Sequence, residues 1–143
     1  MGTEETTIHV FVGAFADLDA ALLYSEEQWL PEPDDSASEA EYSAWEDSNP
    51  SWAMEDELGF YLDSDFIETI GGETRFDYLA TQISDQSAVD RIRQAYATTT
   101  SVLVLIWSDA LDGLSVEMKS TSKLIYCGTY PRRQTSHATL GAI

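Results

Sequence analysis

Two segments of the chain are apolar on both alternating faces, which is typical of strands buried inside a sheet. Residues 8–15 (IHVFVGAF) are apolar at nearly every position, and Val102–Trp107 (VLVLIW) is apolar throughout. Successive side chains of a strand point to opposite faces, so such segments are covered on both sides. We predict two strands here, with residues 8–15 central in the sheet. Residues 123–130 (KLIYCGTY) are predicted to return from Val102–Trp107 as an antiparallel hairpin with a long loop.

Between the first two strands, helical signals alternate with loop signals. A helix is expected after Asp17, a suitable N-cap, with Pro31 ending the element. A short helix is expected over residues 39–47. Another is expected to begin at Pro50 and to stop at Gly59, since proline is favoured at the first helical position and glycine just past the last. Residues 60–62 are expected to be extended.

Two amphipathic helices are predicted in the second half of the chain. Apolar residues recur at helical spacing from position 76 to position 83, and a second helix is expected to begin at Ser87, with Asp90 in a capping box. The buried positions of these two helices are Phe76, Leu79, Ala80, Ile83, Val89, Ile92 and Tyr96.

The order of these elements predicts an α+β fold. A strand, several helices and then two strands lack the regular alternation of a parallel sheet. We expect a small mixed or antiparallel sheet of about four strands, covered by three to five helices. The 143 residues fit a single domain, 1–143. Its ordered core is expected over about residues 7–131, followed by a polar, flexible C-terminal tail.

Charge divides the chain into two unlike parts. Residues 1–74 contain twenty Asp or Glu and no Lys or Arg, whereas all seven Lys and Arg lie from Arg75 onward with only six acidic residues. A surface of one sign repels itself, so fold stability alone does not favour it. A salt-loving source would also give an acidic protein that is poor in Lys, but it predicts acidic residues spread evenly. The uneven distribution favours a surface directed at a basic partner.

The composition excludes several classes of function. A net charge of −19 repels nucleic-acid phosphates and anionic membranes. No apolar run approaches the length of a membrane helix, and the acidic, polar N-terminus lacks a signal-peptide pattern. The single cysteine, Cys127, forms no internal disulfide and is expected to be a packing residue. We therefore expect a cytoplasmic protein that binds neither nucleic acid nor membrane directly, as a monomer or weak homodimer.

Candidate catalytic and metal-binding residues are few. Asp63, Asp65 and Glu68 could approach a hard cation, but their spacing lacks the glycine and distal glutamate of a calcium loop. His9 is interpreted as a partly buried strand residue. No nucleophile arrangement or phosphate-binding loop is found, so we expect no catalytic residue, no metal and no cofactor. A pair of carboxylates acting as acid and base stays open from sequence alone.

The four tryptophans are interpreted mainly as core residues. Trp29 and Trp107 fall on apolar faces. Trp45 and Trp52 lie inside the acidic half, where burial is favoured, although aromatic rings beside acidic side chains are also typical of binding hot spots.

Several short motifs carry a resemblance to a known family. They are the strand ending Val12-Gly13-Ala14-Phe15 before a helix, Leu58-Gly59-Phe60-Tyr61 followed by Asp63, Asp65-Phe66 and Glu68, and the late strand from Leu124 to Tyr130. Over residues 8–130 the chain resembles small bacterial immunity proteins, most closely family twenty-two of the polymorphic-toxin immunity families. The resemblance implies a cytoplasmic inhibitor that protects the producing cell by binding a toxin domain.

Composition and resemblance together predict a non-catalytic inhibitor with an acidic binding surface. Its partner is expected to be a cognate toxin domain that is basic, with a nuclease as one candidate. The residues predicted to contact it are acidic and aromatic side chains from the middle of the acidic half: Trp52, Glu55, Asp56, Glu57, Tyr61, Asp63, Asp65 and Glu68. Two alternatives are a DNA-mimicking regulator of a basic DNA-binding protein and a small carboxylate- or metal-dependent enzyme.

Overall fold

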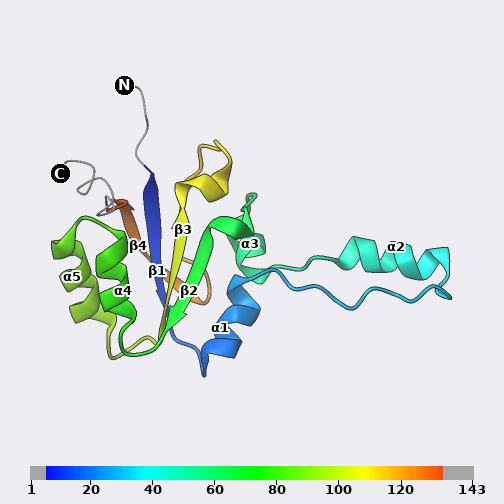
Figure 1. Cartoon of the computed structure of the whole chain (residues 1–143), viewed down its shortest axis with the longest axis horizontal. Helices are drawn as coiled ribbons and strands as arrows, with labels where there is room; N and C mark the ends of the chain where they lie inside the picture. The colour runs from blue at the N-terminus through cyan, green and yellow to red at the C-terminus, as the bar shows by residue number, and fades with distance from the viewer. Residues whose placement is uncertain (1–5, 134–143) are drawn as a thin grey trace, which may run out of the picture.

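The computed structural model describes residues 6–133 and contains one four-stranded sheet. Every neighbouring pair of strands is antiparallel, and the spatial order is β2-β3-β1-β4. The expected α+β fold is thus confirmed (Figure 1). The predicted flexible tail falls mostly in residues 134–143, outside the described residues. The strands are β1 Thr7–Gly13, β2 Ile67–Gly71, β3 Val102–Trp107 and β4 Leu124–Pro131.

The predicted hairpin between the last two strands is wrong. β1 lies between β3 and β4, with Val10 paired to Leu105 on one side and to Gly128 on the other. β1 can take this central position because both of its faces are apolar and can be buried. Its backbone forms hydrogen bonds with β3 along one edge and with β4 along the other. The loop between β3 and β4 is long enough to carry the chain past β1.

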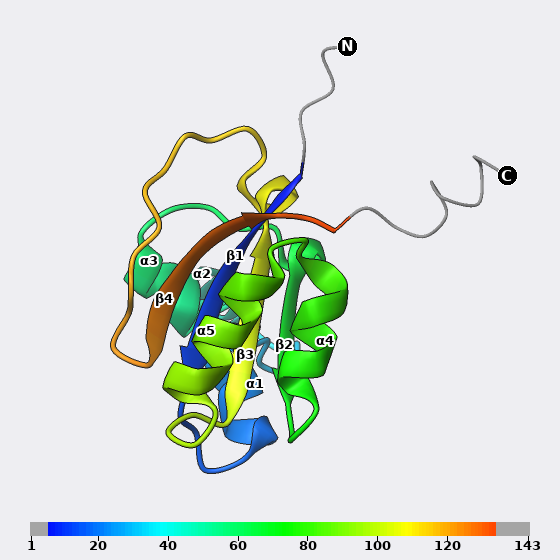
Figure 2. The same ribbon diagram turned by 90° about the vertical axis from the view of Figure 1, so that its left-hand side faces the viewer.

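Helices cover both faces of the sheet and form two separate cores. On one face, α4 (Arg75–Gln82) and α5 (Gln86–Tyr96) pack against alternating residues of β1 and β3, including Val10 and Leu105. On the other face, α1 (Leu18–Ser25) and α3 (Ala53–Leu58) pack with Phe11 and Val104. The sheet is therefore the middle of three layers, as Figures 1 and 2 show.

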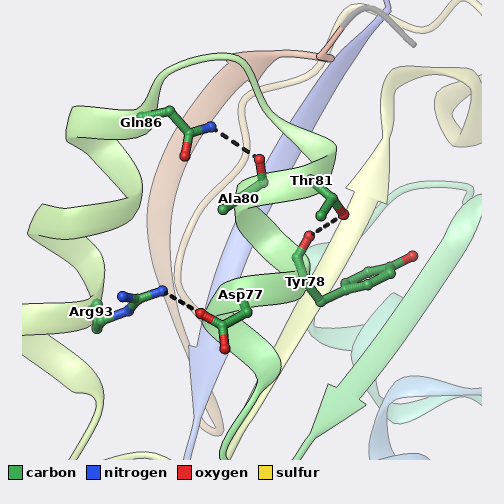
Figure 3. Close-up of polar contacts among 6 residues, drawn as sticks. All are labelled: Asp77, Tyr78, Ala80, Thr81, Gln86 and Arg93. Carbon is green, nitrogen blue, oxygen red and sulfur yellow. Dashed lines mark hydrogen bonds and ion pairs between the residues drawn. The ribbon is translucent and has the colours of Figure 1, made fainter. Parts of the chain in front are cut away.

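Polar contacts hold α4 and α5 together on their solvent side (Figure 3). The Arg93 guanidinium pairs with Asp77 at 3.1 Å, and the Gln86 side-chain amide donates to the Ala80 carbonyl at 3.0 Å. The N-cap of α5 lies two residues earlier than predicted. Asp85 is its N-cap and accepts from the Ala88 N–H at 3.0 Å, so the proposed capping box at Ser87 is wrong.

The connection between α1 and α3 leaves the body of the protein as an arm of residues 29–50. It contains α2 (Glu39–Ser48), which buries none of its residues and projects away from the three layers (Figure 1). The arm is closed at its base by the paired residues Gln28 and Ser51, whose two backbone hydrogen bonds measure 2.7 and 2.9 Å. The sequence predicted the bounds of α2 to within one residue. It did not predict that α2 projects away from the body of the protein.

Three further expectations about this region are corrected. α1 ends at Ser25, so Trp29 lies on the arm and is 58% exposed instead of buried. α3 begins at Ala53 rather than Pro50, because Trp52 precedes its first turn and is held in the core. Trp45 lies on α2, outside both cores.

The predicted helix stop at Gly59 is confirmed by the left-handed φ of 86° at this glycine. Residues 60–62 form no strand, and the edge strand β2 follows them.

Candidate functional site

Most of the acidic half of the sequence, residues 14–66, lies on one side of the sheet, whereas Glu68 and Glu73 lie toward α4. The chain between β1 and β2, residues 14–66, carries sixteen acidic residues and no Lys or Arg, and it builds α1, the arm and α3. The chain between β2 and β3, residues 72–101, carries four acidic residues and three arginines and builds the opposite layer. We call the α1, arm and α3 side the acidic layer. The charge asymmetry of the sequence is therefore an asymmetry in space.

The arm is held by contacts within itself. The Trp45 indole N–H donates to the Leu30 carbonyl at 2.9 Å, and the Tyr42 hydroxyl donates to the Pro33 carbonyl at 2.8 Å. Trp29 and Trp45 stack at a tilt with ring centroids 6.2 Å apart. The arm thereby presents seven carboxylates, four of them on α2, and no Lys or Arg.

The surface is hollowed where the arm joins the body. Two adjoining depressions share Glu27, Trp52 and Ser64 as lining residues. We call this feature the arm-base groove. Its remaining lining residues are Ser25, Glu26, Trp29, Pro50, Glu55, Tyr61, Leu62, Asp63 and Ile67. Carboxylates thus alternate with aromatic and apolar groups, and no Lys or Arg lines the groove.

Four of the predicted contact residues meet at this groove. Trp52 forms its floor, with a side chain only 5% exposed and an indole N–H that donates to the Ser25 carbonyl at 2.9 Å. It therefore supports the surface instead of projecting into a partner. Glu55 accepts from the Leu62 N–H at 3.0 Å, which fixes the turn that carries Tyr61.

Tyr61 is the predicted aromatic anchor that the structure exposes, with 53% of the residue accessible. Partial desolvation raises the pKa of its phenol, and the negative charges of Asp63, Asp112, Glu55 and Asp65 raise the pKa further. The neighbouring carboxylates therefore keep the hydroxyl protonated as a hydrogen-bond donor and surround it with negative potential.

The other predicted contact residues lie outside the groove. Asp56 is exposed on α3, and Asp65 is exposed beside Asp63. Glu68 is on edge strand β2 and accepts a hydrogen bond from Tyr78 of α4, which helps raise the pKa of Tyr78 to about 12, after desolvation. Glu57 is bound within the protein and is discussed below.

Sequence reasoning missed the residues that line the groove between the end of α1 and the start of the arm. Glu27 and Trp29 were assigned to a continuous first helix, so they were not considered as site residues. Pro31 ends the predicted helix, whereas α1 ends at Ser25, so the proline does not mark the point at which the chain leaves the helix.

Titratable residues elsewhere in residues 6–133 form no alternative centre. The His9 ring nitrogen Nδ1 lies 2.8 Å from the Thr129 hydroxyl and 3.1 Å from that of Tyr126, and burial lowers the pKa of the imidazole. Burial raises the pKa of the Cys127 thiol to about 11, so the thiol is an unreactive packing group, as expected. Within this part of the chain no three His, Cys, Asp or Glu residues are grouped to hold a metal ion.

The helices of the structure and three comparisons with known proteins bear on classification. None of the helices in the described residues combines the length and apolar character needed to cross a bilayer. No protein-family model, curated protein or solved structure matches the chain.

Proposed function

We propose that this chain is a non-catalytic inhibitor that binds a basic toxin domain through its acidic layer, as its resemblance to bacterial immunity proteins implies. The observation that carries the proposal is the concentration of carboxylates on one side of the sheet. Repulsion among these charges opposes folding, whereas a basic partner converts the same charges into binding energy. The exposed aromatic residues beside them offer apolar contact area of the kind found in hot spots.

The proposal predicts stoichiometric inhibition. The test requires a candidate toxin, which we expect to be the C-terminal domain of a secreted protein encoded beside this chain's gene. That domain is purified and mixed with increasing amounts of the chain. A binder abolishes the domain's toxicity at equal molar amounts, and co-expression restores growth of a susceptible strain. Inactivation of excess toxin by a small amount of the chain would instead identify an enzyme, and absence of any protection would refute the proposal.

We also predict that long-range attraction between the acidic layer and the basic toxin domain speeds their association. We expect the association rate to fall at least about tenfold between roughly 0.05 M and 0.5 M salt, because screening removes the long-range attraction. Stopped-flow mixing with the same domain measures this rate. A rate that is flat across this range contradicts the mechanism.

A matched pair of variants locates the steering surface. Asp56→Lys alters an exposed residue of the acidic layer on α3, whereas Asp90→Lys alters an exposed residue of α5 on the opposite layer. Both changes alter the net charge equally. We expect Asp56→Lys to slow association by about threefold or more and Asp90→Lys to have a smaller effect. Equal effects would mean that net charge, rather than the acidic layer, directs the encounter.

A further inference from the structure

We infer that the arm-base groove receives arginine side chains from a basic segment of the partner protein. This inference rests on the proposed function, because the basic partner supplies the segment. It goes further by assigning the contact to one groove and to the guanidinium group.

The shape of the groove fits an extended segment. Its two depressions have volumes of about 300 and 370 Å³ and share Glu27, Trp52 and Ser64 as lining residues. Trp29, on the arm, lines one depression, and Tyr61, on the body, lines the other. Consecutive side chains of a bound segment can therefore each find an aromatic surface.

The chemistry of the lining favours a cation with a planar face. Indole and phenol faces attract cations, and a guanidinium can stack on a ring while its N–H groups bind carboxylates. Glu26, Glu27, Glu55 and Asp63 supply such carboxylates. A neutral or acidic segment would displace water from these groups without pairing them, at a cost in free energy.

The groove carboxylates have no cationic partner within the described residues. The one ion pair of residues 6–133 joins Arg93 to Asp77 on the opposite layer. Glu27 accepts a hydrogen bond from the Ser64 hydroxyl at 3.2 Å, and Asp63 accepts from the Asp65 N–H at 3.0 Å. These neutral donors orient the carboxylates and leave acceptor positions free, so the groove is organised before a cation arrives.

The test compares two double variants that remove the same charge. Glu27→Gln with Asp63→Asn changes the groove, and both replacements can keep their internal hydrogen bonds. Asp35→Asn with Glu39→Gln changes two exposed arm residues outside the groove lining. The probe is a hexa-arginine peptide blocked at both ends, and titration calorimetry measures its affinity.

We expect the groove pair to weaken hexa-arginine binding by about tenfold and the arm pair by less than about threefold. Equal weakening would overturn the inference while leaving the acidic layer as a diffuse docking surface. Protection against the toxin is measured separately, so failure of that assay alone would overturn the proposed function.

The aromatic contribution has its own control. Trp29→Ala is expected to weaken hexa-arginine binding by about threefold or more, and to weaken binding of a blocked hexa-lysine peptide less. Leu23→Ala removes a similarly exposed apolar side chain on α1 and should change neither affinity. Equal loss for both peptides, or no loss from Trp29→Ala, would overturn the assignment to arginine.

Discussion

At the residue scale, two charged side chains act inside the protein rather than toward a partner. Arg75 is 6% exposed, and its guanidinium donates to the carbonyls of Gly72, Ala97 and Thr100 at 2.8–3.0 Å. It thereby ties the start of α4 to the end of α5 and to the entry of β3. Sequence analysis identified Arg75 only as the first basic residue, because three contacts to distant carbonyls leave no periodic pattern.

Replacing Arg75 is predicted to destabilise the fold. Arg75→Met keeps much of the side-chain volume but leaves three carbonyls without their charged donor. We expect a loss of about 2–4 kcal/mol in the free energy of unfolding, measured by urea denaturation. Arg75→Lys is the control, since it keeps the charge but not the planar fork, and it should lose part of this stability. A loss below about 0.5 kcal/mol for Arg75→Met would show that the three contacts are dispensable.

Glu57 joins α3 to the loop before β4. Its carboxylate accepts from the Tyr24 hydroxyl at 2.7 Å, from the Ser122 N–H at 2.8 Å and from the Ser122 hydroxyl at 2.9 Å. These hydrogen bonds, with that of Tyr24 first, lower the pKa of Glu57 below its ordinary value. Although it was predicted to face a partner, its acceptor positions are therefore largely used within the fold.

The lowered pKa of Glu57 makes its contribution to stability depend on pH. The unfolded chain binds this proton more readily, so the contribution is present above the unfolded pKa and is lost as pH falls through the folded pKa. Glu57→Gln should unfold about 2–5 °C below the parent at pH 7, and this gap should close toward pH 3. Thermal melts at several pH values measure it. Glu46→Gln on the arm is the control, and a gap for Glu57→Gln that persists at pH 3 contradicts the linkage.

At the element scale, the sequence predicts elements whose pattern is set by their own burial. β1 and β3 were found because both of their faces are covered, and α4 and α5 because one stripe of each is apolar. β2 was missed because it is a short edge strand containing Glu68 and Thr69. Strand order and the position of the arm depend on contacts between segments that are far apart in the sequence. Local signals such as burial periodicity and capping residues do not indicate which segments make these contacts.

The arm is predicted to be dispensable for folding. Gln28 and Ser51 exchange both backbone hydrogen bonds, which is the geometry that closes a two-residue hairpin. Replacing residues 29–50 with Asn-Gly should therefore change the free energy of unfolding by less than about 1 kcal/mol, measured by chemical denaturation. Trp52→Ala, just beyond the deletion, should cost about 3–5 kcal/mol because it empties the core. Unfolding of the deletion variant would show that the arm supports the body.

At the scale of the whole molecule, the sheet separates two surfaces of different charge. The candidate site was predicted in part, because the uneven charge is visible in the sequence and because Glu55, Tyr61 and Asp63 do lie together. Its other wall could not be predicted, because α1 ends at Ser25, earlier than predicted, and this early end lets Glu26, Glu27 and Trp29 line the groove.

Repulsion within the acidic layer predicts that salt stabilises the free protein. The net charge is −19, and the described residues contain one ion pair. Screening weakens repulsion over distances beyond about 10 Å at 0.1 M salt, so the melting temperature should rise with added salt. A rise of about 5 °C by 0.5 M is expected, equally for NaCl and KCl, by scanning calorimetry. A constant or falling melting temperature would show that the carboxylates do not strain the fold.

The chain enters and leaves the sheet at one corner. Thr7 pairs with Pro131, and the Arg132 N–H donates to the Thr6 carbonyl at 2.9 Å, on the side of the sheet away from the arm (Figure 1). A fluorescent label or a biosensor tether attached at Thr6 or at Arg132 therefore emerges from the same corner. A molecule immobilised through this corner is held near β1 and β4, whereas the groove lies beside β2, at the other edge of the sheet, so the tether and the groove are kept apart.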